Sequence, residues 1–323
     1  MQTATDSLSI QSVTCCGRCP SGASEFLHAP LATSLKEFLD NAHSGFNTRQ
    51  QGTAVGFVSA KGGCGSSTIA CHSAVALGAR ASQSDKVLLM DLDLNTGVDQ
   101  FILKARSEYS VLEAVRNYQK LDISYWNSLI SRTHDGLDVL AAPAALHSNE
   151  QLKRDEVQYV LSFARRYYGR IVVDLGRGVG QIAAAVLPQL AELYIVATHE
   201  IIPLHMTKQM LGALDASGFP RERIRLIINR LPRNHRAEIR ELENVLGIPV
   251  ALSLPNDYES LHECYSSGKL LPESSRVAAA IRSVVAMTMG EPIEPKPNIA
   301  MRFLQKWTRS GGVTEPALRL RQG

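Results

Sequence analysis

A short glycine-rich segment of this 323-residue chain has the residue types that bind phosphate. From residue 61 to residue 68 it reads Lys-Gly-Gly-Cys-Gly-Ser-Ser-Thr, between an apolar run (55–58) and a helical pattern (69–81). Small residues at a strand-to-helix turn let backbone N–H groups converge on an anion, and the helix N-terminus adds positive potential. The segment is therefore predicted to cradle the phosphates of a nucleotide.

Two positions of this loop differ from the generic P-loop, G-x-x-x-x-G-K-[ST]. Ser66 stands where the lysine is expected, Ala60 stands where the first glycine is expected, and an earlier lysine, Lys61, remains. The loop lysine places positive charge on the β- and γ-phosphates as charge develops in the transition state, an electrostatic effect of roughly 3 kcal/mol. A serine supplies no charge, so we expect nucleotide affinity to fall somewhat and hydrolysis to fall more.

Acidic residues follow two further strand patterns. Asp91 and Asp93 come after the apolar residues 87–90, and Asp174 closes the run 171–173. Ligands of open α/β sheets bind at the carboxyl ends of the strands, so these residues are expected near the loop. A bound nucleotide requires a hydroxyl and a carboxylate for Mg²⁺ and a group that orients the attacking water. One such aspartate alone is as readily a helix cap, so the prediction rests on their joint order along the chain.

The pattern of elements from residue 53 onward predicts an α/β fold with a doubly wound, mostly parallel sheet flanked by helices. The predicted strands are 54–59, 87–91, 137–141, 171–175, 193–197, 224–229 and 249–253. The predicted helices include 150–168, 204–217, 236–246 and 276–289. We divide the chain into a flexible N-terminal extension (1–51), a nucleotide-binding domain (52–290) and a Pro-rich linker with a basic amphipathic tail (291–323).

Composition places the chain among ordinary globular proteins. It is 45% apolar and 20% charged with a net charge of +3, which is too small to imply nucleic acid by itself. We find no apolar run long enough to span a bilayer and no signal peptide, so we expect a cytoplasmic protein. The cluster of Cys15, Cys16 and Cys19 is interpreted as free thiols, with a metal or redox site as the alternative.

These motifs resemble the MinD/ParA class of deviant Walker A ATPases, in which the loop reads K-G-G-x-G-K-[ST]-T. More narrowly, the chain is similar to the CpaE/TadZ branch, which serves the assembly and placement of Flp (Tad) pili and often has a small residue in place of the loop lysine. The other matching stretches are 136–143, 228–230, 254–258 and 268–271. Residues 1–51 are too short for the receiver-like domain with which many CpaE proteins begin.

The resemblance implies a role for each residue of the loop. Lys61 corresponds to the signature lysine that reaches across a nucleotide-sandwiched dimer and joins the catalytic set. Ser67 is expected to bind Mg²⁺, and Thr68 is expected to contact the α-phosphate. The remaining loop residues are expected to line the phosphates, largely through backbone N–H groups: Gly62, Gly63, Cys64, Gly65 and Ser66.

Residues outside the loop also acquire roles through the resemblance. Asp93 matches the catalytic position that orients water, and Asp91 and Asp174 are expected near the metal. Asn229 matches the residue that hydrogen-bonds adenine, and Arg230 follows it in the nucleotide-binding set. Pro255 begins the loop that packs beside the base.

The function implied is an ATP- and Mg²⁺-binding factor that dimerises with ATP and hydrolyses it slowly or not at all. Its expected partners are pilus or secretion assembly proteins at the inner membrane or the cell pole. One alternative is a ParA/MinD-type partitioning or division-site ATPase. A second is a nucleotide-free scaffold, which the intact Lys61, Ser67, Asp91, Asp93 and Asp174 disfavour.

Two basic surfaces bear on further partners. Arginines at residues 221–240 alternate with acids, which favours an ion-paired surface over DNA binding, so we do not expect nucleic acid as a partner. Residues 299–309 combine Phe, Trp and basic residues, which suits contact with an anionic membrane surface. A helix docked on the domain and a partner-binding motif are the alternatives for this tail.

Overall fold

The computed structural model describes residues 51–82, 85–134, 136–144, 152–232 and 236–292 of the chain. The predicted extension with its cysteine cluster, and the predicted membrane-contacting tail at 299–309, lie outside the described residues. None of the described helices is long and apolar enough to cross a membrane.

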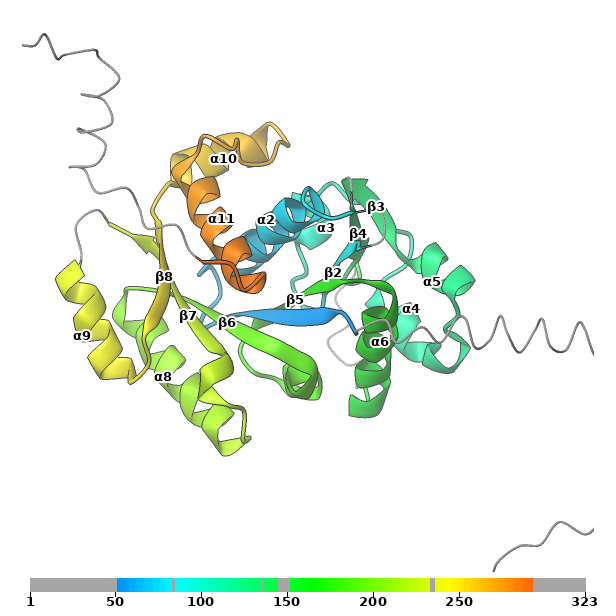
Figure 1. Cartoon of the computed structure of the whole chain (residues 1–323), viewed down its shortest axis with the longest axis horizontal. Coiled ribbons are helices and arrows are strands. Elements are labelled where there is room, and N and C mark those ends of the chain that lie inside the picture. The colour runs from blue at the N-terminus through cyan, green and yellow to red at the C-terminus, as the bar shows by residue number, and fades with distance from the viewer. Residues whose placement is uncertain (1–50, 83–84, 135, 145–151, 233–235, 293–323) are drawn as a thin grey trace, which may run out of the picture. The chain divides into compact units, whose positions relative to one another are not determined.

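An eight-stranded sheet in the order β3-β4-β2-β5-β1-β6-β7-β8 forms the centre of the domain (Figure 1). Every neighbouring pair of strands is parallel except β3 and β4 at one edge. The predicted α/β class with a mostly parallel sheet is therefore confirmed. The strands are β1 (Thr53–Ser59), β2 (Val87–Asp91), β3 (Ser131–His134), β4 (Leu137–Leu140), β5 (Arg170–Arg177), β6 (Leu190–Thr198), β7 (Ile224–Leu231) and β8 (Val250–Pro255).

Helices cover both faces of the sheet. They are α2 (Ser66–Gly78), α3 (Asp99–Ile102), α4 (Val111–Arg116), α5 (Ile123–Leu129), α6 (Arg154–Tyr167), α7 (Gln181–Val186), α8 (Ile201–Ala216), α9 (Arg236–Leu246), α10 (Tyr258–Ser266) and α11 (Arg276–Thr288). Short 3₁₀ turns occupy Tyr118–Lys120, Leu187–Gln189 and Arg221–Arg223.

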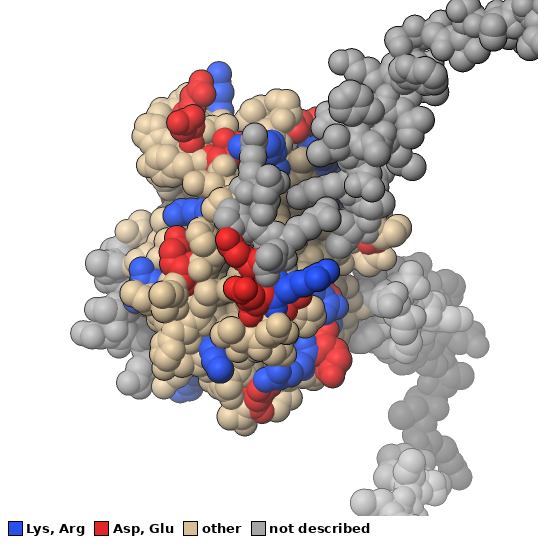
Figure 2. Space-filling view, turned by 90° about the vertical axis from the view of Figure 1, so that its left-hand side faces the viewer, with Lys and Arg blue, Asp and Glu red and all other residues tan. Residues whose placement is uncertain are grey.

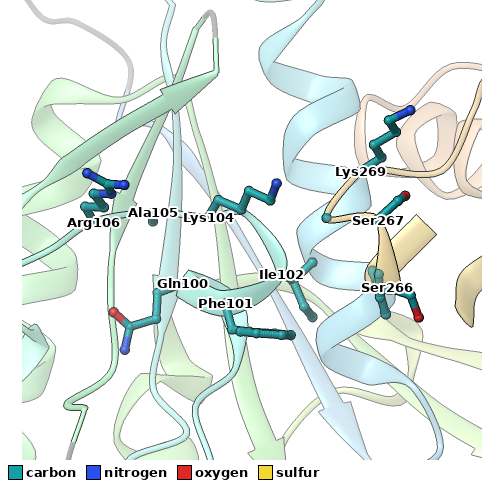
Figure 3. A pocket seen from close by; sticks show the side chains of 11 residues that line it. Gln100, Phe101, Ile102, Lys104, Ala105, Arg106, Ser266, Ser267 and Lys269 are labelled. Atoms are coloured by element: carbon teal, nitrogen blue, oxygen red, sulfur yellow. The ribbon is translucent and has the colours of Figure 1, made fainter. Parts of the chain in front are cut away.

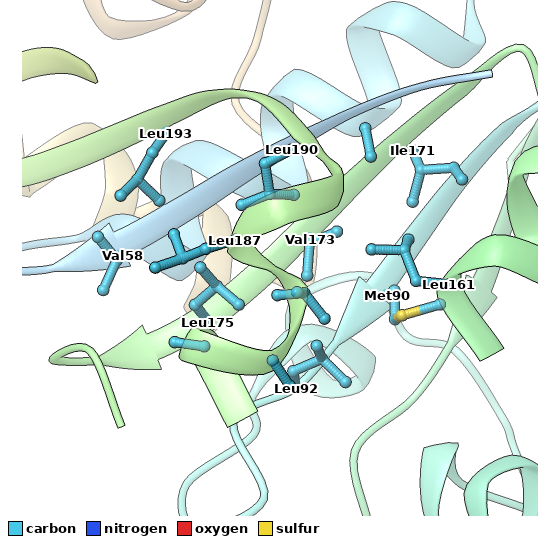
Figure 4. Packing of buried hydrophobic residues seen from close by; sticks show 14 of the residues in the cluster. Val58, Met90, Leu92, Leu161, Ile171, Val173, Leu175, Leu187, Leu190 and Leu193 are labelled. Atoms are coloured by element: carbon cyan, nitrogen blue, oxygen red, sulfur yellow. The ribbon is translucent and has the colours of Figure 1, made fainter. Parts of the chain in front are cut away.

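Two apolar layers form because successive strand residues point to opposite faces. In β1, Val55 and Phe57 pack with α2 and α11, whereas Ala54 and Val58 pack on the opposite face, where α6 and α8 lie. Figure 4 shows Val58 of the second layer with neighbours from β2, β5 and α6. Burial on both faces explains why the central strands are almost wholly apolar.

All seven predicted strands are present, and β3 is the one described strand that sequence patterns missed. Its sequence, Ser-Arg-Thr-His, has no apolar residue, because as an edge strand it pairs only with β4. The short helices α3, α4, α5 and α7 were also missed, since one or two turns give too few residues for a period to appear. The predicted helix 69–81 begins earlier, at Ser66, directly after the loop.

Candidate nucleotide and metal site

The loop between β1 and α2 has the backbone of an anion cradle. Gly63 and Gly65 have φ angles of 85° and 98°, in the left-handed region that favours glycine. The Ser59 hydroxyl donates to the carbonyl oxygen of Lys61 at 2.6 Å, and the N–H of Cys64 donates to the same oxygen at 3.2 Å. These hydrogen bonds hold the loop in shape without a ligand. The first N–H groups of α2 have no acceptor within the helix, so they can bind an anion.

Asn229, at the end of β7, is a second brace for this loop. Its Nδ2 donates to the carbonyl oxygen of Cys64 at 2.8 Å, across 165 positions of sequence, and its Oδ1 accepts from the N–H of Arg230 at 2.9 Å. Arg230 itself has a φ of 56°, which is uncommon outside glycine. Asn229 therefore lies against the loop, and its predicted hydrogen bond to adenine stays a prediction.

Three buried carboxylates converge at the ends of β2 and β5. Asp91 and Asp174 are partners in the register of these strands, and Asp99 opens α3 beside them. One oxygen of each of the three lies within 4.8 Å of the others. The N–H groups of Asp93 and Asp99 donate to the Asp91 carboxylate at 2.9 and 3.4 Å, which fixes its orientation.

Three neighbouring carboxylates without a cation repel one another in a buried place. Burial raises the pKa of Asp91, Asp99 and Asp174, and the charges of nearby aspartates raise them further. The Oδ2 atom of Asp99 is buried, and no described residue donates a hydrogen bond to it. Hard oxygen ligands of this kind suit Mg²⁺, so the residues present fit that ion. The hydroxyl of Ser67 hydrogen-bonds Asp174, which brings the predicted Mg²⁺ ligand to the same place.

Asp99 is the part of this cluster that sequence reasoning missed. It follows Thr96-Gly97-Val98 outside any predicted strand, where an aspartate is usually a helix cap. The one sequence feature that could have indicated Asp99 is the nearby Gly97, because a side chain at residue 97 would collide with Asp91 and Ala142. A glycine needed for such a close approach indicates that the chain folds back on the strand end.

Asp93 lies beside the metal-type cluster but has a different set of partners. Its Oδ1 accepts from the N–H groups of Asn95 and Thr96 at 3.2 and 3.0 Å, and its Oδ2 accepts from the Thr96 hydroxyl at 2.5 Å. A side chain at Gly176 would lie 2.5 Å from the Asp93 Cγ atom, so the end of β5 packs against it. Asp93 therefore shapes its own loop here, and its predicted role toward water stays a prediction.

A cleft of about 860 Å³ opens between the loop and the start of α8. Lys61, Arg230, Ile201 and Ile202 are among the residues that line it. The two isoleucines are 84% and 62% exposed, which is unusual for adjacent apolar residues. Pro255, the predicted base-side residue, pairs with Leu231 of β7, close along the chain to Asn229 and Arg230.

Thr68 connects the loop to the opposite end of the sequence. Its Oγ1 atom accepts from the Tyr265 hydroxyl at 3.3 Å, and its carbonyl lies 2.8 Å from His72 Nδ1. The N–H of Leu271 donates to His72 Nε2 at 3.3 Å, so the neutral ring carries its hydrogen on Nδ1. Burial lowers the pKa of His72, which favours this neutral form. Tyr265 and His72 had no signal in the sequence.

The arginines of residues 221–240 are partly neutralised by ion pairs. Arg221 pairs with Asp215 and Arg225 with Glu192, each at 2.6 Å. On the face that includes the α9 and β8 side of the domain, basic and acidic residues are interspersed (Figure 2). Mixed charge of this kind gives little of the electrostatic attraction on which binding to DNA phosphates depends.

The glycine loop has left-handed φ angles and lies at the start of a helix, and aspartates stand at the ends of two adjacent parallel strands. This arrangement is typical of P-loop nucleotide-binding proteins. Known proteins with this architecture are similar to the chain. A putative septum site-determining protein MinD from Mesostigma viride is 26% identical over 207 residues, which are 62% of this chain and 69% of the relative. No protein-family model matches.

Solved structures agree with this likeness. A ParA family ATPase from Chlorobium tepidum superposes with a TM-score of 0.67 at 27% identity, covering 74% of this chain and 98% of the other. MinD from Pyrococcus horikoshii, solved with Mg-ADP, has the same fold at 20% identity, with a TM-score of 0.60 over 73% of this chain and 95% of the other. The chain therefore has the fold of the MinD/ParA-type P-loop ATPases and is similar in sequence to members of that family.

Substitution of Asp99 by asparagine should stabilise the metal-free protein. Asparagine carries no charge at any pH, so the variant avoids the cost of either ionising or protonating a third buried carboxyl group. We expect the free energy of unfolding near neutral pH to rise by about 1–3 kcal/mol. The wild-type folded state holds protons that the unfolded chain has lost, so its stability falls as pH rises above the ordinary aspartate pKa of 3.8. Thermal melts in EDTA between about pH 5 and about pH 8 should show a shallower fall for the variant.

Asp155, which is exposed in the first turn of α6, provides the matched control. Its asparagine variant should lose a small favourable interaction with the helix dipole and should not change the pH slope. Added Mg²⁺ should stabilise the wild type more than the Asp99 variant. A pH slope that Asp99→Asn leaves unaltered would contradict the assignment of the three carboxylates to one cation site.

Proposed function

We propose that the chain binds ATP with Mg²⁺ at the loop of residues 61–68 and acts as a nucleotide-controlled positioning protein. The observation that carries this proposal is the convergence of Asp91, Asp99 and Asp174 beside the left-handed glycine loop. A phosphate cradle and a cation site in contact are what a magnesium nucleotide requires. The Mg-ADP bound to Pyrococcus horikoshii MinD supports the same ligand class for this chain.

Within this proposal, each part of the site has a defined task. The N–H groups at the start of α2 hold phosphate oxygens, and Ser67 and the buried aspartates hold Mg²⁺, which neutralises phosphate charge. Asn229 holds the loop in place through its hydrogen bond to the Cys64 carbonyl oxygen. Asp93 is the residue proposed to orient water once Mg²⁺-nucleotide is bound. Lys61 is proposed to reach the nucleotide of a second subunit.

Hydrolysis is proposed to be slow. Ser66 is the first residue of α2 and is only 4% exposed, so its short hydroxyl side chain cannot bring a charge to the β- and γ-phosphates. Stabilisation of charge in the transition state is usually the largest single catalytic effect. Binding relies more on backbone N–H groups, which Ser66 retains. The chain is thus better suited to a long-lived ATP-bound state than to rapid turnover.

The biological task proposed first is placement of another structure within the cell. Similarity to the septum site-determining MinD proteins and to the ParA family ATPase favours a MinD- or ParA-type positioning role at the cytoplasmic face of the inner membrane or the cell pole. The second candidate is assembly of a Flp (Tad) pilus or a related secretion apparatus. It is favoured by Ser66, because the CpaE/TadZ branch tolerates a small residue there, and by the segment 254–258.

ATP-dependent dimerisation tests the switch directly. Light scattering of the full chain with Mg-ATP should give twice the monomer mass, whereas Mg-ADP should leave a monomer. Lys61→Ala should bind nucleotide but stay monomeric, because it removes the only charge the loop can offer a second subunit. Lys120→Ala, at an exposed lysine of the 3₁₀ turn Tyr118–Lys120, is the control and should dimerise normally. A mass that is the same with ATP, with ADP and without nucleotide would overturn the proposal.

A further inference from the structure

A second hollow, of about 720 Å³, lies apart from the nucleotide cleft. One wall is α3 and the segment that follows it, residues 100–106, and the other is the end of α10 with the turn at 267–269 (Figure 3). We call it the basic hollow. The side chains on which its chemistry depends are Phe101, Lys104, Arg106, Ser266, Ser267 and Lys269.

The basic hollow carries positive charge that the protein leaves uncompensated. Lys104, Arg106 and Lys269 are all exposed, and none makes an ion pair with any described residue. No acidic residue is among the described residues that line it. Figure 3 shows Lys104 reaching from the first wall toward the second, with Arg106 and Lys269 at opposite ends. The turn has glycine at residue 268, where the φ of 62° lies in the left-handed region, and the end of the Lys104 side chain lies close to its Cα atom.

An exposed aromatic ring accompanies these cations. Phe101 is 75% exposed, although phenylalanine is normally among the most buried residues. Aromatic side chains and arginine are enriched at protein-binding surfaces, where a ring such as Phe101 anchors a partner. Charges around the ring, including those of the two lysines, then select a partner of complementary charge. A nucleic-acid duplex instead requires an extended run of cations along its phosphates, which a hollow between two short segments does not offer.

We propose that the basic hollow binds an acidic segment of a partner protein. Carboxylates of the segment pair with Lys104, Arg106 and Lys269, and an apolar side chain of the segment covers Phe101. The Ser266 hydroxyl donates a further hydrogen bond, whereas the Ser267 hydroxyl already donates to the Cys264 carbonyl oxygen at 3.0 Å. Charge complementarity selects an acidic partner over a basic one, since a basic segment would bring like charges together.

Both walls of the basic hollow are joined to the nucleotide site. The first wall begins at Asp99, whose N–H donates to Asp91 and whose carboxylate accepts from the Cys71 thiol of α2 at 3.1 Å. The second wall contains Tyr265, whose hydroxyl donates to Thr68. Cation binding at the aspartates and phosphate binding at Thr68 would therefore act on opposite walls. This coupling, which rests on the proposed function, makes the partner's affinity depend on the bound nucleotide.

A phage-displayed library of 12-residue peptides, selected on the immobilised full chain, tests this inference. Enriched peptides should carry several Asp or Glu residues and an apolar residue. Fluorescence anisotropy with the enriched peptide should show at least tenfold weaker binding to the double variant Lys104→Glu/Lys269→Glu and weaker binding to Phe101→Ala. Lys120→Glu is the matched charge reversal and should bind as the wild type does. Circular dichroism melts establish that each variant is folded.

Several outcomes would overturn the inference. The first is enrichment of peptides without acidic residues, and the second is equal binding of a peptide to the wild type and the double variant. The third is that no peptide is enriched while the wild type binds duplex DNA or phosphatidylserine vesicles and the double variant does not. Affinities are compared without nucleotide, with Mg-ADP and with Mg-ATP, while calorimetry on the same samples reports nucleotide binding. Peptide binding by a chain that takes up no nucleotide would refute the proposed function and the coupling but support the hollow. Nucleotide uptake without peptide binding would refute the hollow alone.

Discussion

Replacement of Gly65 by alanine is expected to reduce nucleotide affinity at least 100-fold. The residue has a φ of 98°, which costs an L-residue about 1–2 kcal/mol. A Cβ atom there would lie 2.5 Å from Asn229 Nδ2, closer than side chains approach. Relief of that collision separates Asn229 from the Cys64 carbonyl and moves the N–H groups that hold phosphate. The affinity of wild type and variant for Mg-ATP is measured by titration calorimetry.

Gly212 offers a matched glycine in the same fold. It lies within α8, has no left-handed φ and has no atom near the place of an added Cβ. Gly212→Ala should bind nucleotide as the wild type does and should stabilise the helix by roughly 1 kcal/mol. If Gly65→Ala binds Mg-ATP with wild-type affinity, the loop is not where the phosphates bind.

Substitution of Ser66 by lysine is expected to raise the rate of ATP hydrolysis by 10- to 100-fold. Ser66 is the first residue of α2 and is buried beside the loop. A lysine side chain there is expected to extend into the phosphate site and to supply the charge that the loop lacks. Loss of one comparable hydrogen-bond donor in other enzymes costs about 100- to 1,000-fold in rate. Nucleotide affinity should rise less, because backbone N–H groups already provide much of it. Phosphate release under saturating Mg-ATP measures the effect.

Ser66→Gln separates charge from size in this experiment. Its side chain is long and polar but uncharged, so it should leave hydrolysis near the wild-type rate. A Ser66→Lys variant in which both binding and hydrolysis are unchanged would contradict the idea that the missing lysine limits turnover.

The fold could be predicted to a large extent because the central strands are apolar on both faces. Strands such as β1 and β5 appear as continuous apolar runs, and the loop lies directly after one of them. The edge strand β3 and the short helix α3 leave no such pattern, since partial burial and one turn of helix require no particular sequence.

The site was predictable where residues adjoin strand ends and not where distant segments meet. Asp91 and Asp174 follow apolar strands, so sequence placed them at one sheet edge, and the structure brings them together. Asp99 has no such marker. The contacts of Asn229 with Cys64 and of Tyr265 with Thr68 join residues 165 and 197 positions apart, and only the folded chain reveals them.

Titration calorimetry of the wild-type chain with Mg-ATP is the most direct test of the central claim, that this loop binds nucleotide although Ser66 replaces its lysine. We predict saturable binding of one nucleotide per chain, which EDTA weakens because Asp91, Asp99 and Asp174 then repel one another without a cation. An absence of binding heat at millimolar Mg-ATP, with the chain folded, would contradict the account and leave a scaffold that has kept only the fold.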